Sequence, residues 1–408
     1  MAQRARVLVV GAGLAGCATA WHLAADHDVL VVDQGSAPGA EATAQNAGMV
    51  RRLGEDPAER ALALRTVDFL AAPGPDWAGL VVSRRTGALL GLSQDRWHLH
   101  DAVAHVRAHG VTVDSVDAEE ATRLAPALRG SPLQQRWWLP DERVADPHAL
   151  MTGYLRGLRR MGAEVRCNVR VQGLRAVAGR VVGVDTDAGP MRADRVVLAA
   201  GAWSATLAQS VGLQRPLFPL RRTVLTTTTH PLSTADHPWC WIDDAGLYIR
   251  PENGGFWLSA CDEALDPPRP GPGSRGSADD VTRARALDKL QRLMPALSDL
   301  RPTGGWTGLR TFAPDRCPML GADPELRGLW WTAALGGFGV TCNYAAGEAV
   351  ASWMRGDEVP WLHRDSVDPG RHLLRRFPIR PLGELHGPRL IDATRVPQRR
   401  PAPSKTDT

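Results

Sequence analysis

The chain is poor in several features, and each shortage narrows what it can be. Lys289 and Lys405 are the only lysines, so nearly all of the 48 basic residues are arginines, and 44 acidic residues leave a formal net charge of +4. So small a surplus, with no basic stripe, argues against nucleic acid as a partner. No stretch of 18 apolar residues runs without glycine or a charged residue, so we expect no membrane-spanning segment.

Cysteine chemistry and metal binding are also weakly represented. The six cysteines are scattered, and no two have the CxxC spacing of a zinc site or a dithiol redox motif. They are typical of reduced, buried thiols. His98 and His100 alternate along the chain, but no cysteine or acidic cluster completes a metal site. The first residues lack the apolar region of a signal peptide. We therefore expect a cytoplasmic protein without a bound metal.

The overall balance is that of a globular protein, with 44% hydrophobic and 23% charged residues in 408. That length fits two domains, or one large α/β core with insertions. No GxSxG or Cys/His pattern suggests a hydrolase. The adjacent acids Asp141-Glu142 and Asp243-Asp244 are expected in solvated loops. As an alternative, Asp243 or Asp244 meets a cationic substrate side chain.

Residues 6–33 have the pattern of one βαβ unit. Apolar strands are predicted at 6–10 and 29–33, and a helix at 17–26, with a GxGxxG turn between the first strand and the helix. Gly11 permits the tight turn, Gly13 lets the backbone approach a pyrophosphate, and Gly16 lets the helix pack on the strand. Asp33, at the end of the second strand, is suited to ribose hydroxyls. The unit predicts a dinucleotide site for NAD or FAD, and its expected contact residues are Gly11, Ala12, Gly13, Leu14, Ala15, Gly16, Asp33 and Gln34.

The rest of the chain alternates between the two element types. Helices are predicted at 58–71, 101–109, from 117, at 147–161, 278–294 and 343–355. Strands are predicted at 164–167, 169–176, 181–186, 195–200, 223–229, 246–250 and 328–334. The segment 266–277 is rich in proline and glycine and is expected to be a loop. Beyond about 360 the chain is rich in proline and arginine without sustained periodicity, and we expect a partly disordered tail.

Several further motifs follow one another along the chain. They are Glu41-Ala42-Thr43-Ala44-Gln45-Asn46-Ala47-Gly48, Asp146-Pro147, Ala199-Ala200-Gly201-Ala202-Trp203, Trp306-Thr307-Gly308-Leu309-Arg310, Ala313-Pro314-Asp315, Pro318-Met319-Leu320-Gly321 and Gly336-Gly337-Phe338-Gly339-Val340-Thr341. In this order they resemble the D-amino-acid oxidase superfamily of FAD-dependent amine oxidoreductases, which includes glycine oxidase, sarcosine oxidase and D-amino-acid dehydrogenases. The resemblance covers about residues 5–356, and 300–345 is most similar to D-arginine dehydrogenase.

The resemblance implies an α/β fold with two parts. A discontinuous Rossmann-type FAD-binding domain would comprise 1–80, 145–215 and 300–358. A β-sheet-rich substrate domain would comprise 81–144 and 216–299. The remaining residues, 359–408, would form the tail.

The resemblance also implies that the cofactor is FAD and which residues hold it. The further cofactor-binding candidates are Thr43, Asn46, Ala47, Gly48, Val171, Ala200, Gly201, Trp203, Gly308, Arg310, Gly336, Gly337, Phe338, Gly339, Val340 and Thr341. Gln45 stands where the family often has arginine. Trp203 as ordinary core and Val171 as a plain strand residue are the alternatives. Covalent attachment in some relatives uses a cysteine just after the Trp-Thr-Gly segment, where this chain has Arg310 and Thr311. We therefore expect noncovalent FAD.

The implied activity is oxidation of the C–N bond of an amino acid or related amine, by hydride transfer from the α-carbon to flavin N5 and hydrolysis of the imine to a 2-oxo acid. Arg310 would bind the substrate carboxylate and Tyr248 would lie beside it, and Met49, Arg222 and Gly337 would face the substrate. A structural ion pair for Arg310 and a packed core position for Tyr248 are the alternatives. The electron acceptor is open between O₂ and a quinone. Oxidation of a 2-hydroxy acid, or flavin binding without amine oxidation, are the alternative functions.

Overall fold

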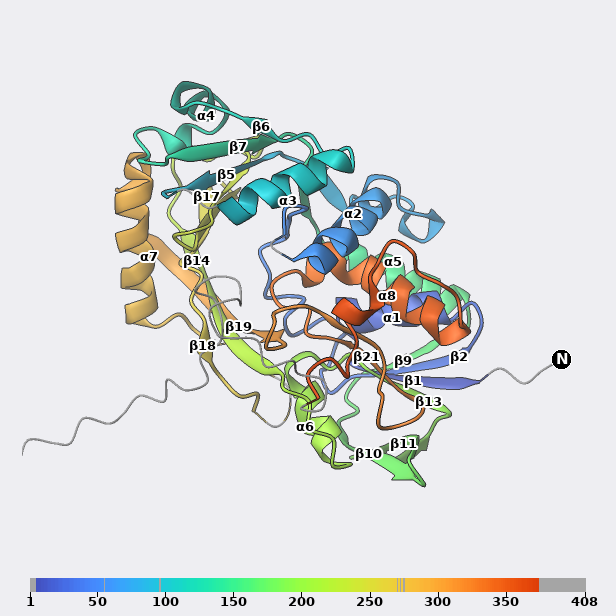
Figure 1. Cartoon of the computed structure of the whole chain (residues 1–408). Helices are drawn as coiled ribbons and strands as arrows, with labels where there is room; N and C mark the ends of the chain where they lie inside the picture. The colour runs from blue at the N-terminus through green and yellow to red at the C-terminus, as the bar shows by residue number, and fades with distance from the viewer. Residues whose placement is uncertain are drawn as a thin grey trace, which may run out of the picture.

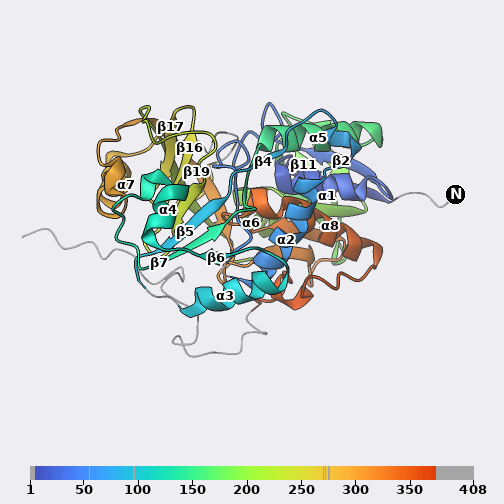
Figure 2. The ribbon, with the colours of Figure 1, turned by 90° about the horizontal axis from the view of Figure 1, so that it is seen from above.

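The computed structural model describes residues 5–373 apart from 55, 95–96, 270, 272 and 274–275, and the chain forms two lobes. Figures 1 and 2 show the lobes side by side, one carrying helices α1, α2, α5 and α8 and the other carrying α4 and α7. Each lobe is built around its own large sheet. No helix in the described ranges has both the length and the apolar character needed to cross a bilayer.

The first lobe contains a six-stranded sheet in the order β20-β21-β13-β1-β2-β9. Its strands are β1 (Arg6–Val10), β2 (Asp28–Val32), β9 (Glu164–Arg166), β13 (Arg195–Leu198), β20 (Met319–Ala322) and β21 (Leu329–Ala333). All neighbours pair in parallel except β20 and β21. The strands are almost fully buried apolar runs, as a parallel sheet covered on both faces requires.

Side-chain alternation along these strands separates two cores. Val7 and Val9 of β1 pack under the helices, whereas Leu8 and Val10 pack against the opposite layer. The helical layer consists of α1 (Leu14–Leu23), α2 (Pro57–Ala71), α5 (Pro147–Arg160) and α8 (Gly339–Arg355). The opposite layer is a three-stranded antiparallel sheet with α6 (Ser204–Gln209), and its strands are β10 (Val171–Val177), β11 (Arg180–Thr186) and β12 (Gly189–Arg192). Figure 1 shows β10 and β11 below the sheet and α1 and α8 above it.

The second lobe contains a nine-stranded sheet, in which β14 is paired with β17, β18 and β19. Its strands are β5 (Ala88–Leu92), β6 (Asp114–Ser115), β7 (Gln135–Leu139), β14 (Phe218–Thr227), β15 (Trp239–Ile242), β16 (Leu247–Glu252), β17 (Gly255–Ser259), β18 (Ala264–Leu265) and β19 (Pro302–Phe312). Helix α3 (Trp97–Ala108) packs on one face, and α4 (Ala118–Leu124) and α7 (Asp280–Leu293) pack on the other.

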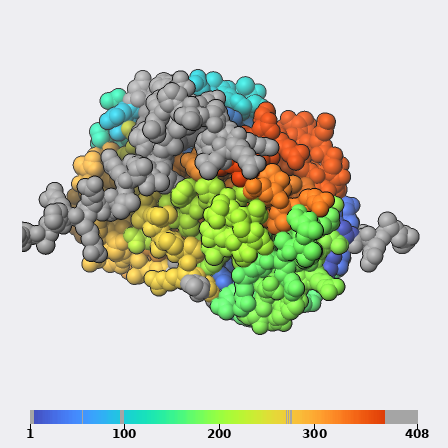
Figure 3. Space-filling model, turned by 60° about the horizontal axis from the view of Figure 1, so that its bottom comes forward, coloured from blue at the N-terminus to red at the C-terminus, as the bar shows by residue number. Residues whose placement is uncertain are grey.

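Short elements join the lobes. A small antiparallel sheet consists of β3 (Met49–Val50), β4 (Ser83–Arg85) and β8 (Arg143–Ala145). Single 3-10 turns are η1 (Pro75–Trp77), η2 (Pro126–Leu128), η3 (Gly201–Trp203), η4 (Pro295–Leu297) and η5 (Arg364–Ser366). Figure 3 shows one face of the molecule, where residues near 215 lie between those near 180 and those near 250.

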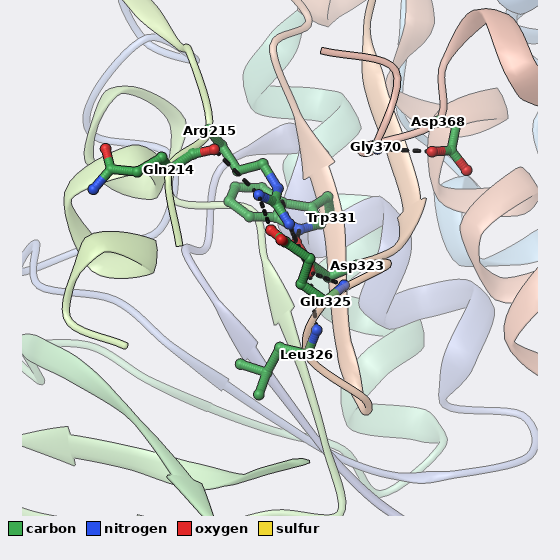
Figure 4. Close-up of polar contacts among 8 residues, drawn as sticks. All are labelled: Gln214, Arg215, Asp323, Glu325, Leu326, Trp331, Asp368 and Gly370. Atoms are coloured by element: carbon green, nitrogen blue, oxygen red, sulfur yellow. Dashed lines mark hydrogen bonds and ion pairs between the residues drawn. The ribbon is translucent and has the colours of Figure 1, made fainter. Parts of the chain in front are cut away.

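A buried ion pair holds the crossing from the first lobe to the second. Arg215 lies just before β14, and its guanidinium donates to both oxygens of Asp323 at 2.8 Å (Figure 4). Trp331 Nε1 donates to the same carboxylate at 2.9 Å, and Glu325 accepts from Arg215 at 2.8 Å. Removing one partner of such a pair leaves a buried charge and typically costs about 3–5 kcal/mol.

Two features differ from the sequence-based expectation. The segment 300–358 divides between the lobes, because β19 joins the nine-stranded sheet while β20 and β21 join the six-stranded one. The expected tail begins too early, since Val359, Leu362 and Val367 are buried against α8 and β20. These apolar residues show no helical or strand period in the sequence, so their burial can be recognised only from the residues that they pack against. Residues 374–408 lie outside the described residues.

Candidate active site

A cavity of about 480 Å³ runs along the carboxyl ends of β1 and β13 and reaches the β14–β19 pair. Its lining brings together the first glycine turn, the segment 39–46, β10, the turn at η3 and a second glycine turn before α8. The predicted site residues that line it are Gly11, Gly13, Leu14, Ala15, Asp33, Gln34, Thr43, Asn46, Val171, Ala200, Gly201, Trp203, Arg222, Gly308, Arg310, Gly336, Gly337, Gly339 and Val340.

The three glycines of the first turn differ in what a side chain at each position would contact. Gly11 has φ +106°, and a Cβ there would lie 2.4 Å from the Ala199 carbonyl oxygen. A Cβ on Gly16 would lie 1.8 Å from the Gly11 oxygen, so this glycine is required by the packing of the chain on itself. A Cβ on Gly13 would meet only Thr43 Oγ1, at 3.3 Å. Gly13 therefore leaves open space that the fold does not use and that a bound pyrophosphate would fill.

Asp33 and Thr43 shape the turn while facing the cavity. The Asp33 carboxylate accepts from Ala12 N and from Gly35 N, both at 2.7 Å. Each carboxylate oxygen keeps further acceptor capacity for ribose hydroxyls. Thr43 Oγ1 accepts from Leu14 N at 3.0 Å, which satisfies one of the free N–H groups at the start of α1.

Gln45 provides a test of whether the cavity suits a polar ligand. Its side chain is only 7% exposed and lines the cavity, yet neither amide atom has a hydrogen-bond partner among the described residues. A buried, unsatisfied amide is costly unless a ligand completes it. Asn46 serves the backbone instead, because its Oδ1 accepts from Gly48 N at 2.6 Å and its Nδ2 donates to the Thr43 carbonyl.

Part of the cavity wall is formed by β10 and the turn after β13. Val171 lines it together with its neighbours Arg170 and Gln172, which the sequence analysis did not single out. Trp203 also lines the cavity, and its Nε1 donates to the Arg269 carbonyl at 2.9 Å. This contact ties the loop 266–269 over the cavity, so Trp203 is not simply a core residue.

The second glycine turn precedes α8 and touches the predicted carboxylate-binding residue. Gly336 has φ +53°, and a Cβ on it would lie 2.5 Å from Phe312. A Cβ on Gly337 would lie 2.7 Å from Arg310 Nη1, so the guanidinium lies directly against this glycine. The N-terminus of α8 has no side-chain cap, which leaves its N–H groups available to an electron-rich ligand edge.

Arg310 and Arg222 lie on neighbouring strands. Arg310 of β19 pairs with Leu220 of β14, so Arg222, two residues further on, is its diagonal neighbour on the same face. Both line the cavity, and Arg310 has no hydrogen bond or ion pair to any described residue. Burial, and then the charge of Arg222, lower the pKa of Arg310 to about 10. Arg310 keeps intermediate exposure, and a partly buried guanidinium with no partner favours binding of an anion.

Tyr248 and Met49 pack in an apolar cluster with Val224 of β14 and Trp306 of β19. Tyr248 of β16 is fully buried, and its ring centroid is 5.2 Å from that of Trp241. Burial raises the pKa of Tyr248, and the charge of Arg310 opposes that shift. Met49 packs against two buried apolar clusters rather than lining the cavity. The predicted residues that do not line the cavity are Ala12, Gly16, Ala47, Gly48, Met49, Tyr248, Phe338 and Thr341.

The acidic pairs that were expected in solvated loops include two buried residues, and that expectation is wrong for them. Asp243 is 1% exposed and pairs with Arg51 at 3.3 Å, and Glu142 is 0% exposed and pairs with Arg52. Burial raises the pKa of Glu142 against the opposing charge of Arg52. Both arginines come from the segment beside β3, far away in sequence, so adjacent acids alone gave no signal of their burial.

Arg51 is a structural residue that the sequence analysis missed. Its guanidinium lies 4.4 Å from the Trp241 ring centroid and 4.9 Å from that of Phe338. It therefore joins the second lobe to the second glycine turn. Asp244 accepts from Ser93 N and Gln94 N, and with Asp243 paired to Arg51 neither acid lines the cavity. The alternative of a cationic substrate side chain at these acids is not supported.

The part of the chain that the structure describes contains no cluster of histidine, cysteine and acidic residues able to hold a metal. By contrast, the residues present fit a dinucleotide: open space at Gly13, acceptors on Asp33, and the unsatisfied Gln45 amide. The first glycine turn and Asp33 would hold the adenosine and pyrophosphate, and the second glycine turn would hold the far end of FAD.

Comparison with known proteins agrees with this geometry. The family described as FAD dependent oxidoreductase matches residues 6–353. A glycine oxidase of Pseudomonas aeruginosa is 31% identical over 363 residues, covering 86% of this chain and 95% of that protein. A D-amino acid dehydrogenase of Paramagnetospirillum magneticum is 28% identical over 412 residues, with 86% and 95% covered. The solved structure of L-proline dehydrogenase from P. horikoshii has a TM-score of 0.79 at 21% identity, covering 91% of this chain and 98% of that one. The chain belongs to the FAD-dependent oxidoreductase family, and it is an enzyme that uses FAD.

Proposed function

We propose that the enzyme oxidises the C–N bond of an amino acid or a related amine that carries a carboxylate. The observation that carries this proposal is Arg310, a cavity-lining cation that has no partner among the described residues. Its guanidinium lies against Gly337 of the second glycine turn. Two relatives, named glycine oxidase and D-amino acid dehydrogenase, point to the same class of substrate.

Arg310 would perform the positioning step. Its planar guanidinium can bind both oxygens of a carboxylate, which fixes the α-carbon at the adjoining glycine turn. Tyr248 and Trp306 lie in one buried apolar cluster with Val224, which would help to exclude water from the adjoining strands. When bound, FAD accepts a hydride from the α-carbon, and the resulting imine hydrolyses to a 2-oxo acid.

We propose that FAD is held noncovalently. No cysteine is among the described residues that line the cavity. Cys317, the first cysteine after the Trp-Thr-Gly segment, is 7% exposed and contacts the Asp315 carbonyl instead. FAD should therefore be released into solution by mild acid denaturation, and flavin that remained on the chain would overturn this part of the proposal.

The wider assignments also remain proposals. We propose an FAD-binding domain from 1–80, 145–215 and about 313–358, and a substrate domain from 81–144 and 216–312, with the last boundary moved to follow β19. We propose a cytoplasmic enzyme, since all six cysteines are free. The electron acceptor is O₂ or a quinone.

The test is reduction of bound flavin in the absence of oxygen. The purified holoenzyme is mixed with glycine, N-methylglycine, D- and L-amino acids, the matching 2-hydroxy acids and the decarboxylated amines, and the flavin absorbance is followed. We expect amino acids to bleach the flavin and the decarboxylated amines to do so poorly. Bleaching by 2-hydroxy acids alone, or by no compound, would overturn the proposal. Reoxidation by air or by a quinone then identifies the acceptor.

A further inference from the structure

The second arginine of the cavity, Arg222, is already engaged by the chain itself. In the antiparallel register of β14 with β18, Arg221 faces Ala264, so Arg222 faces Glu263. Arg222 Nη2 donates to Glu263 Oε1 at 2.7 Å. On the other side of β14, Arg222 is paired with Gly308 of β19, which has no side chain to compete for it.

Glu263 is held in this place from its other side. Arg316 donates to both of its oxygens, at 2.7 and 3.1 Å, and lies 4.1 Å over the Phe312 ring. Burial alone would raise the pKa of Glu263, but the hydrogen bond from Arg316 and the charge of Arg222 keep that pKa below its ordinary value. The carboxylate therefore stays ionised and remains on Arg222. Glu263 itself does not line the cavity and acts through Arg222.

The two cavity arginines consequently differ in what they can bind. Arg310 has no hydrogen bond or ion pair to any described residue, whereas Arg222 is paired, 7% exposed, and has only Nε and Nη1 without a partner. With Glu263 in place, one cavity cation still lacks a counter-charge. A first carboxylate can bind Arg310 without displacing any described group, whereas a second would have to compete with Glu263 for Arg222.

We propose that Glu263 is a specificity-determining residue that limits the site to substrates with one carboxylate. It occupies Arg222 Nη2 with a carboxylate that it shares with Arg316, so that amino dicarboxylic acids are disfavoured relative to monocarboxylic ones. This inference rests on the proposed function, since it takes Arg310 as the residue that binds the first carboxylate.

Replacing Glu263 with glutamine keeps the side chain's shape and removes its charge. Arg222 then becomes a second buried cation able to bind a carboxylate, and a hydrogen bond between charged groups is worth roughly tenfold to a hundredfold in affinity. Asp262→Asn is the matched control: Asp262 is the preceding residue, its carboxylate accepts from Thr223 N and Oγ1 rather than from Arg222, and its charge acts on Arg222 less than that of Glu263 does.

The experiment uses the holoenzymes of wild type, E263Q, D262N and the double variant E263Q/R222Q. Acetate and propionate are compared with malonate and succinate by titration of the flavin absorbance spectrum, and glycine is compared with iminodiacetate and D-aspartate by kcat/KM. In E263Q we expect the dicarboxylate-to-monocarboxylate ratio to rise by about tenfold or more. The ratio should stay within about twofold of wild type in D262N, and E263Q/R222Q should lose the gain, because the variant removes the cation that caused it.

The outcomes separate this inference from the proposed function. If wild type binds monocarboxylates but E263Q leaves the ratio unchanged, or wild type already prefers dicarboxylates, the role of Glu263 is wrong and the proposed function stands. If no carboxylate perturbs the wild-type flavin and no amino acid reduces it, both are wrong. Should E263Q fail to fold, R222Q alone decides: we expect it to cost monocarboxylate affinity far less than loss of Arg310 does, and an equal loss would overturn the inference.

Discussion

The two ends of the cavity select their ligands by different means. At the dinucleotide end the chain offers backbone: glycines that let it come close, N–H groups at the start of α1, and a carboxylate that bonds the turn itself. At the substrate end it offers side chains that meet only because β14, β18 and β19 are paired. The dinucleotide end depends on glycines, which have no side chain, within one short segment. The substrate end depends on charged side chains of paired strands, in which Leu220 and its partner Arg310 are 90 residues apart in the sequence.

The largest effect is expected from separating the roles of Gly13 and Gly16. Gly13→Val should give a folded protein without FAD, because the fold tolerates a Cβ there and the bound pyrophosphate does not. Gly16→Ala should disturb the fold itself, since its Cβ would lie 1.8 Å from the Gly11 oxygen. Flavin absorbance and far-ultraviolet circular dichroism distinguish the two. A yellow Gly13→Val protein would contradict the assignment.

At the substrate end, Arg310→Ala should lower kcat/KM for an amino acid by roughly 30-fold to several thousandfold, which corresponds to about 2–5 kcal/mol for a desolvated charge pair. Bound FAD should be largely retained. Arg310→Lys should rescue only part of the loss, because an ammonium lacks the planar fork. The control is the decarboxylated amine of the same substrate, and equal losses on acid and amine would show that Arg310 does not bind the carboxylate.

A smaller effect is expected where the second glycine turn meets Arg310. Gly337→Ala would place a Cβ 2.7 Å from Arg310 Nη1 and so displace the guanidinium. Misplacement of about 1 Å can cost on the order of 100-fold in rate, so we expect a loss between about 10- and 100-fold in kcat/KM. Unchanged carboxylate affinity in a flavin titration would mean that Arg310 does not need this glycine.

Tyr248→Phe tests the wall behind the substrate end. If its hydroxyl supports the charged pair at Arg310, the loss is about 1–2 kcal/mol, roughly 5- to 30-fold in kcat/KM. Because Tyr248 is fully buried, thermal unfolding of the variant provides the control for packing. A stability change with unchanged kcat/KM assigns the residue to the core alone.

The last prediction concerns stability in acid, in the helical layer of the first lobe, and no change in kcat/KM is expected from it. The ring of His22 in α1 meets that of Tyr344 in α8 edge to face, with the ring centroids 4.7 Å apart, and burial lowers the pKa of His22 to about 4. The unfolded chain holds this proton more tightly, so the contribution is complete above about pH 6.5 and is lost as the pH falls towards 4, by at most about 3 kcal/mol. Denaturant unfolding at several pH values should show a shallower acid loss in His22→Gln. Parallel pH profiles of the two proteins would contradict it.

Local patterns were sufficient for much of this molecule. The βαβ unit, the order of most helices and strands, and the glycine turn that lines the cavity follow from turns and periodicity that short segments carry, because a glycine turn needs no distant partner. The resemblance located Arg310 and the second glycine turn. Neither source predicted the buried pairs of Arg51 with Asp243 and of Arg52 with Glu142, or the packing of Val359, Leu362 and Val367.

The sequence by itself determined that the chain holds a dinucleotide, since the first turn, its helix and Asp33 lie within about 30 residues. Only the tertiary structure decided which arginine is available to a substrate. Both Arg222 and Arg310 are strand residues with the same chemistry, and the difference between them is Glu263, which strand pairing brings opposite one and not the other. Charge on a side chain is local, but its neutralisation depends on neighbours that folding alone supplies.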